Sequence, residues 1–306
     1  MTPEVVATLR KTIGGKTSLL VSRAVDIAAR NGLVELMPEM IDAFGRFVEN
    51  GATVDKGCRA KTSVVKALNT FEYLGATIYL AGAYYVQMEP SFGPPEDTAV
   101  ELRSSCALAL ARIVHPEAHF VLADLLVDSS LSVRTAAVKA LTYLGDLEGE
   151  ALLRLKVLTG DRADVVGECF LGLMTMAPTR SLDFVARYLN VVDLRSESQQ
   201  DLMENAALAI GASHLPEALE KLLTAYRHAP STARRALLLP IALIRSDEAF
   251  DHLLSVLRDA NPSLAVEAIV PLHLYTGDKY VDQVREAVSQ RAAPAISLRF
   301  SEEFGE

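Results

Sequence analysis

VRTAAVKALTYLG, the stretch from Val133 to Gly145, decides the fold of this chain. Its small and branched apolar residues recur at i, i+4, i+7, i+8 and i+11, a spacing that places them on one face of an α-helix. Gly145 closes the stretch, as glycine commonly does at the C-terminus of a helix. Weaker copies of the same pattern occur on both sides, so the chain repeats one helical unit.

The copies follow one another at a nearly constant distance along the chain. When they are aligned on Arg134, the equivalent positions are Arg103, Val166, Arg234 and Val266, with gaps of 31, 32, 68 and 32 residues. The longest gap holds one further unit, so the period is about 31–36 residues, within the range of helical solenoids. In such an array each unit buries its apolar face against its neighbours.

We therefore predict an all-α superhelix of about eight helical hairpins, each an A helix followed by a B helix, in one domain over residues 1–291. Ser196 and Gln199 have the spacing of a capping box at the start of the sixth B helix. A helix at 278–291 is expected as a polar cap, and residues 292–306 as an extended or disordered tail. The expected pairs are 3–13 with 17–31, 34–49 with 56–72, 75–87 with 97–114, 117–127 with 131–144, 149–158 with 163–176, 179–190 with 197–211, 216–228 with 231–245, and 248–258 with 263–275.

Composition excludes several classes of function. The net charge of −9 and the absence of Trp argue against a nucleic-acid partner, which normally requires a basic surface. The three cysteines are far apart and form no metal-binding motif, so we expect reduced, buried thiols and a cytoplasmic protein. No signal peptide and no membrane-spanning window of apolar residues are recognisable, and we expect no membrane partner, no metal and no cofactor.

The repeated motif resembles a known class of helical repeat. The pattern VRxxAxxALxxLG, from Val133 to Gly145, with Asp128 in the preceding turn, resembles a HEAT repeat. The short period is most similar to the HEAT-like class named after phycobilisome lyases. The resemblance covers about residues 97–277. It implies a right-handed α-solenoid whose B helices line the inner surface, and it implies little about function.

Three functional branches of HEAT-like proteins can be compared with this sequence. Di-iron enzymes that resemble deoxyhypusine hydroxylase need repeated His-Glu pairs, and no His-Glu dipeptide occurs here. DNA glycosylases of this fold rely on a basic groove with aromatic residues, which the acidic balance and the lack of Trp disfavour. Bilin lyase subunits share the repeat type, but no diagnostic residues can be matched. That third branch remains open.

The inner surface becomes apolar in the C-terminal half, because the positions that face away from the predicted core carry large apolar side chains there. Two interpretations follow. Either these helices are apolar all round because they are buried on several sides, or they line a hydrophobic groove that binds a partner. The candidate groove residues are Phe170, Leu171, Met174, Arg235, Leu238, Leu239 and Leu274.

A second candidate surface combines a long loop at 87–97 with charged residues that open two B helices. The loop contains three prolines and is longer than the other A-to-B turns, and insertions in solenoids often lie at binding surfaces. The charged residues either pair with one another between repeats or bind a charged ligand or peptide. The candidates are Asp55, Lys56, Arg59, Glu89, Phe92, Asp97 and Arg103.

The sequence contains few residues that could act as catalytic groups. Cys58 has basic neighbours in sequence and is the best candidate for a thiol of lowered pKa, but no His lies near it to act as a base. His115 and His119 have a metal-ligand spacing, yet Pro116 takes His115 out of the helical register. We therefore expect no catalytic residues and no metal site, although enzymatic activity is left uncertain.

These observations favour a non-enzymatic scaffold or adaptor that binds another protein, or a peptide segment of it, along the inner surface. The alternative is a lyase or chaperone-lyase subunit that handles a bulky apolar ligand such as a tetrapyrrole. The sequence indicates neither the oligomeric state nor the partner.

Overall fold

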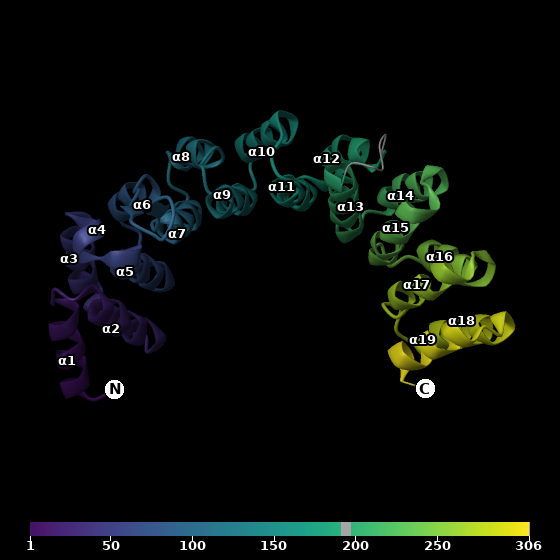
Figure 1. The fold of residues 1–306 in the computed structure, drawn as a ribbon, viewed down its shortest axis with the longest axis horizontal. Helices are drawn as coiled ribbons and strands as arrows, with labels where there is room; N and C mark the ends of the chain where they lie inside the picture. Colours follow the sequence, from purple (N-terminus) through teal and green to yellow (C-terminus); the bar gives the residue numbers. More distant parts are fainter. Residues whose placement is uncertain (191–196, 306) are drawn as a thin grey trace. The chain divides into compact units, whose positions relative to one another are not determined.

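A computed structural model describes residues 1–190 and 197–305 of the chain. In these residues the secondary structure is helical, apart from one two-stranded hairpin. Contacts divide the chain into two compact units, unit 1 (Met1–Leu152) and unit 2 (Leu153–Glu306). The predicted all-α fold of stacked helical hairpins is confirmed in each unit (Figure 1). Ser196, which begins the predicted capping box, lies outside the described residues.

Unit 1 contains the first four hairpins. Its B helices are α2, α5, α7 and α9, and successive B helices pack directly against one another. The elements are α1 (Pro3–Ile13), α2 (Ser18–Arg30), η1 (Val34–Leu36), α3 (Met37–Val48), α4 (Gly51–Val54), η2 (Lys56–Cys58), α5 (Arg59–Thr70), α6 (Ala76–Ala83), β1 (Met88–Glu89), β2 (Glu96–Asp97), α7 (Val100–Arg112), α8 (Ala118–Leu125), α9 (Leu131–Leu144) and the first residues of α10 (Leu147–Thr159).

Unit 2 contains the remaining hairpins in two layers. Figure 1 shows α13, α15, α17 and α19 in one layer and α12, α14, α16 and α18 in the other. The elements that follow α10 are α11 (Ala163–Met176), α12 (Pro178–Ala186), η3 (Arg187–Leu189), α13 (Glu197–Ala212), α14 (Pro216–His228), α15 (Ser231–Leu243), α16 (Asp247–Asp259), α17 (Pro262–Leu272), α18 (Asp278–Arg291) and α19 (Pro294–Phe304).

The local sequence explains why these helices begin and end where they do. In α9 the apolar face predicted from the VRTAAVKALTYLG stretch is buried, including Val133, Ala137 and Leu141. The helix ends at Gly145, which adopts a left-handed conformation (φ 70°) that glycine tolerates without steric cost. Small residues on the B helices allow the close stacking of the layer, because they let neighbouring backbones approach.

The C-terminal tail differs from the prediction. Residues 292–306 were expected to be extended or disordered, but Pro294–Phe304 forms helix α19, which packs against α17 and α18. Ile296 and Phe300, one helical turn apart, are buried in this contact. The 278–291 helix is therefore the A helix of a ninth hairpin in the described residues, rather than the final cap.

Candidate functional site

One candidate site is an open groove on unit 2, across the exposed face of helices α13, α15, α17 and α19. Its volume is about 1010 Å³, and each of the four helices contributes side chains to its lining. All four are the second helices of their hairpins. The groove is therefore lined by equivalent surface positions of successive hairpins.

A row of apolar side chains runs along this groove. Leu208 on α13, Leu239 on α15 and Val270 on α17 occupy equivalent positions 31 residues apart and line the groove. Leu171 on α11 has the same position relative to its hairpin. These four side chains are 37–44% exposed, although the neighbouring apolar positions of the same helices are buried. We call these four residues the apolar row.

A second row carries alternating charges about one helical turn before the apolar row. Glu204, Arg235, Glu267 and Arg299, on α13, α15, α17 and α19, all line the groove. Arg235 Nη1 lies 3.3 Å from Glu267 Oε1, and Arg299 pairs with Glu302 and Glu303 on its own helix. We call these four residues the charged row. An ion pair this exposed contributes little stability.

The structure separates the predicted groove residues into two sets. Leu171, Arg235 and Leu239 are exposed as the groove interpretation expects, and Leu274 is half-buried beyond the end of α17. Phe170 and Met174 are buried, so their assignment to an exposed groove is wrong. Leu238 is also buried to 1% exposure, although its edge contributes to the groove lining.

The burial of Phe170 and Met174 has a simple geometric cause. Helix α11 packs against α13, the second helix of the next hairpin, and against α12, so the face of α11 that carries Phe170 and Met174 is covered. Phe170 packs against Tyr188, with ring centroids 4.8 Å apart. The core interpretation thus holds for Phe170 and Met174, and the groove interpretation holds for the residue one position along, Leu171. A one-residue step turns a helix by about 100°.

The candidate groove residues predicted from the sequence omit five members of the two rows: Leu208, Val270, Glu204, Glu267 and Arg299. Leu208 belongs to the hairpin within the 68-residue gap, where the repeat pattern was not matched. It lies 31 residues before Leu239, so the repeat period could have identified it. Glu204 precedes Leu208 by one helical turn and was not predicted for the same reason. Arg299 was missed because its segment was expected to be a loose tail, which has no fixed position relative to the groove.

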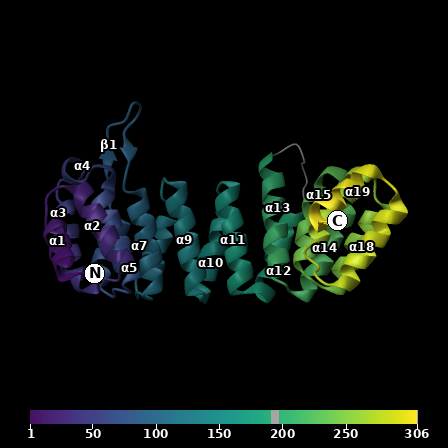
Figure 2. The ribbon, with the colours of Figure 1, turned by 90° about the horizontal axis from the view of Figure 1, so that it is seen from below.

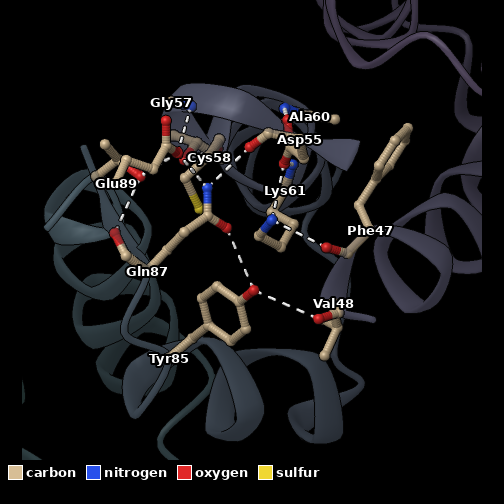
Figure 3. A network of polar contacts seen from close by, with 12 residues as sticks. Phe47, Val48, Asp55, Gly57, Cys58, Ala60, Lys61, Tyr85, Gln87 and Glu89 are labelled. Carbon is tan, nitrogen blue, oxygen red and sulfur yellow. Dashed lines mark hydrogen bonds and ion pairs between the residues drawn. The ribbon is translucent and has the colours of Figure 1, made fainter. Parts of the chain in front are cut away.

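The second candidate surface, the charged cluster of unit 1, is organised around a buried ion pair. Lys61 Nζ lies 2.9 Å from Asp55 Oδ2, and both side chains are fully buried. The ammonium group also donates to the carbonyl oxygen of Phe47 at 3.0 Å and lies 5.0 Å from the centre of the Tyr85 ring. Figure 3 shows Lys61 pointing at both Asp55 and Phe47.

The hairpin β1–β2 is anchored to this ion pair through Gln87 and Glu89. Gln87 Nε2 donates to the Asp55 carbonyl oxygen at 2.8 Å and to Glu89 Oε1 at 2.6 Å. Glu89 Oε1 also accepts from Gly57 N at 2.7 Å and Thr98 Oγ1 at 2.8 Å (Figure 3). Partial burial opposes ionisation, but these hydrogen bonds outweigh it and lower the pKa of Glu89.

Arg103 joins two successive repeats. Its guanidinium group lies 2.7 Å from Asp97 Oδ2 and 2.8 Å from Asp128 Oδ2, and it donates to the carbonyl oxygen of Tyr85. Burial tends to raise the pKa of Asp97, but hydrogen bonds from the backbone of Ala99 and Gln87, and then Arg103, lower it overall. Asp97 and Arg103 thus pair with each other, but within one hairpin, whereas the pair between successive hairpins is that of Arg103 with Asp128.

The candidate residues do not include the ion-pair partner of Asp55. Asp55 pairs with Lys61, and Arg59 and Lys56 are exposed to solvent. A sequence signal could have found Lys61, because each aspartate is followed six residues later by a basic residue: Lys61 after Asp55, Arg103 after Asp97 and Arg134 after Asp128. The buried charges of this cluster pair with one another, so few of them can contact a charged ligand.

Cys58 also differs from the prediction. Its thiol is buried, and burial raises its pKa to about 11. The charge of Lys61 lowers the pKa by a smaller amount, and the charge of Asp55 raises it. A thiol with this pKa is protonated at neutral pH and is a poor nucleophile.

The tip of the β1–β2 hairpin is the most exposed part of unit 1. Met88 pairs with Asp97 and Glu89 with Glu96 in an antiparallel register. Figure 2 shows the hairpin projecting beyond the ends of the unit 1 helices. Phe92 at its tip is fully exposed.

Searches for other chemistry in the described residues give no further site. No group of three or more His, Cys, Asp or Glu side chains in residues 1–190 and 197–305 is placed to hold a metal ion. Within the same ranges, no helix has both the length and the apolar character needed to cross a membrane.

Comparison with known proteins gives structural similarities only. No protein-family model matches the chain, and no curated protein matches it. One similar solved structure is the complex of CpcE and CpcF of phycocyanin lyase from Nostoc sp. PCC7120, at 17% identity over 79% of this chain and 92% of that chain, with a TM-score of 0.41. Another is an engineered protein, at 16% identity over 99% of this chain and 87% of that chain, also with a TM-score of 0.41. At these values the likeness adds nothing to the fold described above.

Proposed function

We propose that this protein is a binding scaffold or adaptor whose unit 2 groove holds a segment of another protein. The apolar row carries this proposal. Soluble proteins rarely expose contiguous apolar surface without a partner, and here the exposure recurs at one position of four hairpins. The charged row borders the apolar positions, as polar groups border the apolar centre of protein interfaces.

The chemistry of the groove favours binding over catalysis. Its lining combines aliphatic side chains with arginine, glutamate and small hydroxyl residues, and no Cys or His belongs to the part of the lining that the structure describes. The three cysteines are buried and form no disulfide. Free thiols are what we expect of a protein in a reducing compartment such as the cytoplasm.

The test is a comparison of two leucine variants of the full chain. Leu239→Glu places a charge in the centre of the apolar row, whereas Leu158→Glu changes a more exposed leucine on α10, outside the groove. Both variants are used as bait in an extract of the cells that encode the protein. The proposal predicts a partner that wild type and Leu158→Glu retain and Leu239→Glu loses. Equal retention by all three baits would contradict it.

A second candidate is the lyase or chaperone-lyase subunit for a bulky apolar ligand. The groove favours it through its size, which is at the upper end of the volumes of small-molecule sites. It is also the class of protein named in one of the similar structures. Under this alternative, purified protein mixed with a tetrapyrrole such as biliverdin shows a shifted visible absorbance band, and Leu239→Glu abolishes the shift.

A further inference from the structure

The two rows of the unit 2 groove have a fixed relationship. Glu204 precedes Leu208 by four residues, Arg235 precedes Leu239 by four, and Glu267 precedes Val270 by three. Side chains three or four residues apart lie on the same face of a helix. Each helix therefore presents one charge beside one apolar side chain, and the pattern repeats across the stack.

The distance between successive helices sets the distance between these repeats. Packed helices lie roughly 8–10 Å apart. On α13, Gly211 is so near α15 that a Cβ atom there would lie 2.4 Å from the Pro240 carbonyl oxygen, so these two helices are closely packed. A ligand that crosses the helices thus meets an apolar side chain about every 8–10 Å.

Polypeptide conformations differ in how well they match this interval. Residues on one face of a β-strand recur every second residue, at about 6.8 Å, or every fourth, at about 13.6 Å, and neither fits. A polyproline II helix repeats at about 9.3 Å, but its recognition grooves are lined by aromatic residues, and the described lining of this groove contains none. An α-helix returns to nearly the same face every seventh residue, after about 10.5 Å, which is slightly above this interval but nearer to it than either strand spacing.

The charged row adds a constraint on the partner. Along the stack the charges alternate: Glu204, Arg235, Glu267 and Arg299. A uniformly charged helix would meet a like charge at every second position, which disfavours binding. The complementary helix carries a basic residue opposite Glu204 and an acidic residue opposite Arg235. The ion pair between Arg235 and Glu267 is solvent-exposed, with side chains 69% and 40% exposed, so it can rearrange at low cost.

We propose, building on the function proposed above, that the groove binds an amphipathic α-helix of a partner protein. This helix crosses α13, α15 and α17, places an apolar residue against the apolar row at every seventh position, and carries flanking charges that alternate in sign. The three groove positions Leu208, Leu239 and Val270 then correspond to partner residues in three successive heptads.

Photo-crosslinking measures this register directly. Three full-length variants each carry p-benzoylphenylalanine in place of Leu208, Leu239 or Val270, and a fourth carries it in place of Leu158 as a control. The cross-linked partner residues are identified by mass spectrometry. The inference predicts one partner segment whose attachment sites advance by about seven residues from each groove position to the next, in line with the heptad spacing of an α-helix.

The possible outcomes separate this inference from the proposed function. Attachment sites that advance by two, three or four residues, or that lie in unrelated segments, would show a protein partner that is not a helix in this register. The function would then stand and the inference would fail. Absence of protein cross-links from all three groove positions, or equal cross-linking from Leu158, would overturn both.

Discussion

Gly211 of α13 lies directly against the backbone of Pro240 of α15. A Cβ atom at Gly211 would lie 2.4 Å from the Pro240 carbonyl oxygen and 2.8 Å from its Cα atom. Because the opposing atoms belong to the backbone, they cannot move aside as a flexible side chain can. This contact fixes how closely the two helices pack, and hence the spacing of the groove above them.

Replacing Gly211 by Ala should therefore destabilise unit 2. Overpacking of this kind costs about 1–3 kcal/mol of unfolding free energy. The matched control is Gly45→Ala on α3, where no atom lies within 4 Å of the added methyl group and the residue is helical and exposed. That change should stabilise unit 1 by about 0.5–1 kcal/mol. Urea denaturation followed by circular dichroism measures both; equal effects of the two variants would contradict the close contact.

The ion pair between Lys61 and Asp55 should be costly to break from one side. Lys61→Met removes the cation and leaves a fully buried carboxylate whose remaining partners are the backbone N–H groups of Ala60 and Lys61. A buried pair broken in this way loses about 3–5 kcal/mol. Lys66→Met, at an exposed lysine of the same helix, should change the unfolding free energy by less than about 1 kcal/mol. A small loss for Lys61→Met would mean that Asp55 is not buried as described.

Helix α19 should contribute to the stability of unit 2 through Phe300. Phe300→Ala removes a buried ring and should lower the unfolding free energy by about 3–5 kcal/mol. Leu298→Ala, at an exposed position of the same helix, should have an effect within about 0.5 kcal/mol. Chemical denaturation distinguishes the two. If Phe300→Ala were as neutral as Leu298→Ala, the C-terminal residues would not be docked.

The buried thiols should make the protein less stable in alkali. Burial raises the pKa of Cys58 from 9.0 to about 11 and that of Cys169 to about 12, and it raises the pKa of Cys106 as well. Above pH 9 the unfolded chain loses these protons while the folded chain keeps them. The stabilising contribution is therefore complete below pH 9 and is lost as the pH rises toward 11 for Cys58 and toward 12 for Cys169.

The slope of this alkaline loss is at most about 1.4 kcal/mol per pH unit for each thiol. Substituting all three cysteines by Ala should flatten the dependence of the unfolding free energy on pH between 9 and 11. The part that remains comes from buried tyrosines such as Tyr275, whose pKa is raised to about 12. A slope unchanged by the triple substitution would show that the thiols are accessible to solvent.

The sequence predicted the repeat architecture well because its signals are local. Periodic alanine and leucine positions, proline at helix starts and glycine at helix ends do not depend on distant contacts. The fourth B helix, for example, was expected at 131–144 and observed as Leu131–Leu144. The tail was predicted wrongly because α19 is stabilised by tertiary contacts with α17 and α18, in which Ile296 and Phe300 are buried, and local sequence signals do not reveal these contacts.

The candidate sites were predicted less well because they depend on orientation between repeats. Phe170 and Leu171 are adjacent, yet the first is buried and the second is exposed, and periodicity alone cannot fix the helix rotation to within one residue. Lys61 was not predicted because the β1–β2 hairpin changes the spacing between its repeat and the next. The ion-pair partner of a buried charge depends on the tertiary structure, and the amino-acid composition does not identify it.

The most direct test of the account is the affinity of the recovered partner for three purified full-length proteins. Isothermal titration calorimetry should show that Leu158→Glu binds like wild type, because the substituted side chain lies outside the groove. Leu239→Glu should weaken binding by at least about tenfold, which corresponds to about 1.4 kcal/mol of lost binding free energy. If Leu239→Glu bound the partner as tightly as wild type while remaining folded, the unit 2 groove would not be the binding surface.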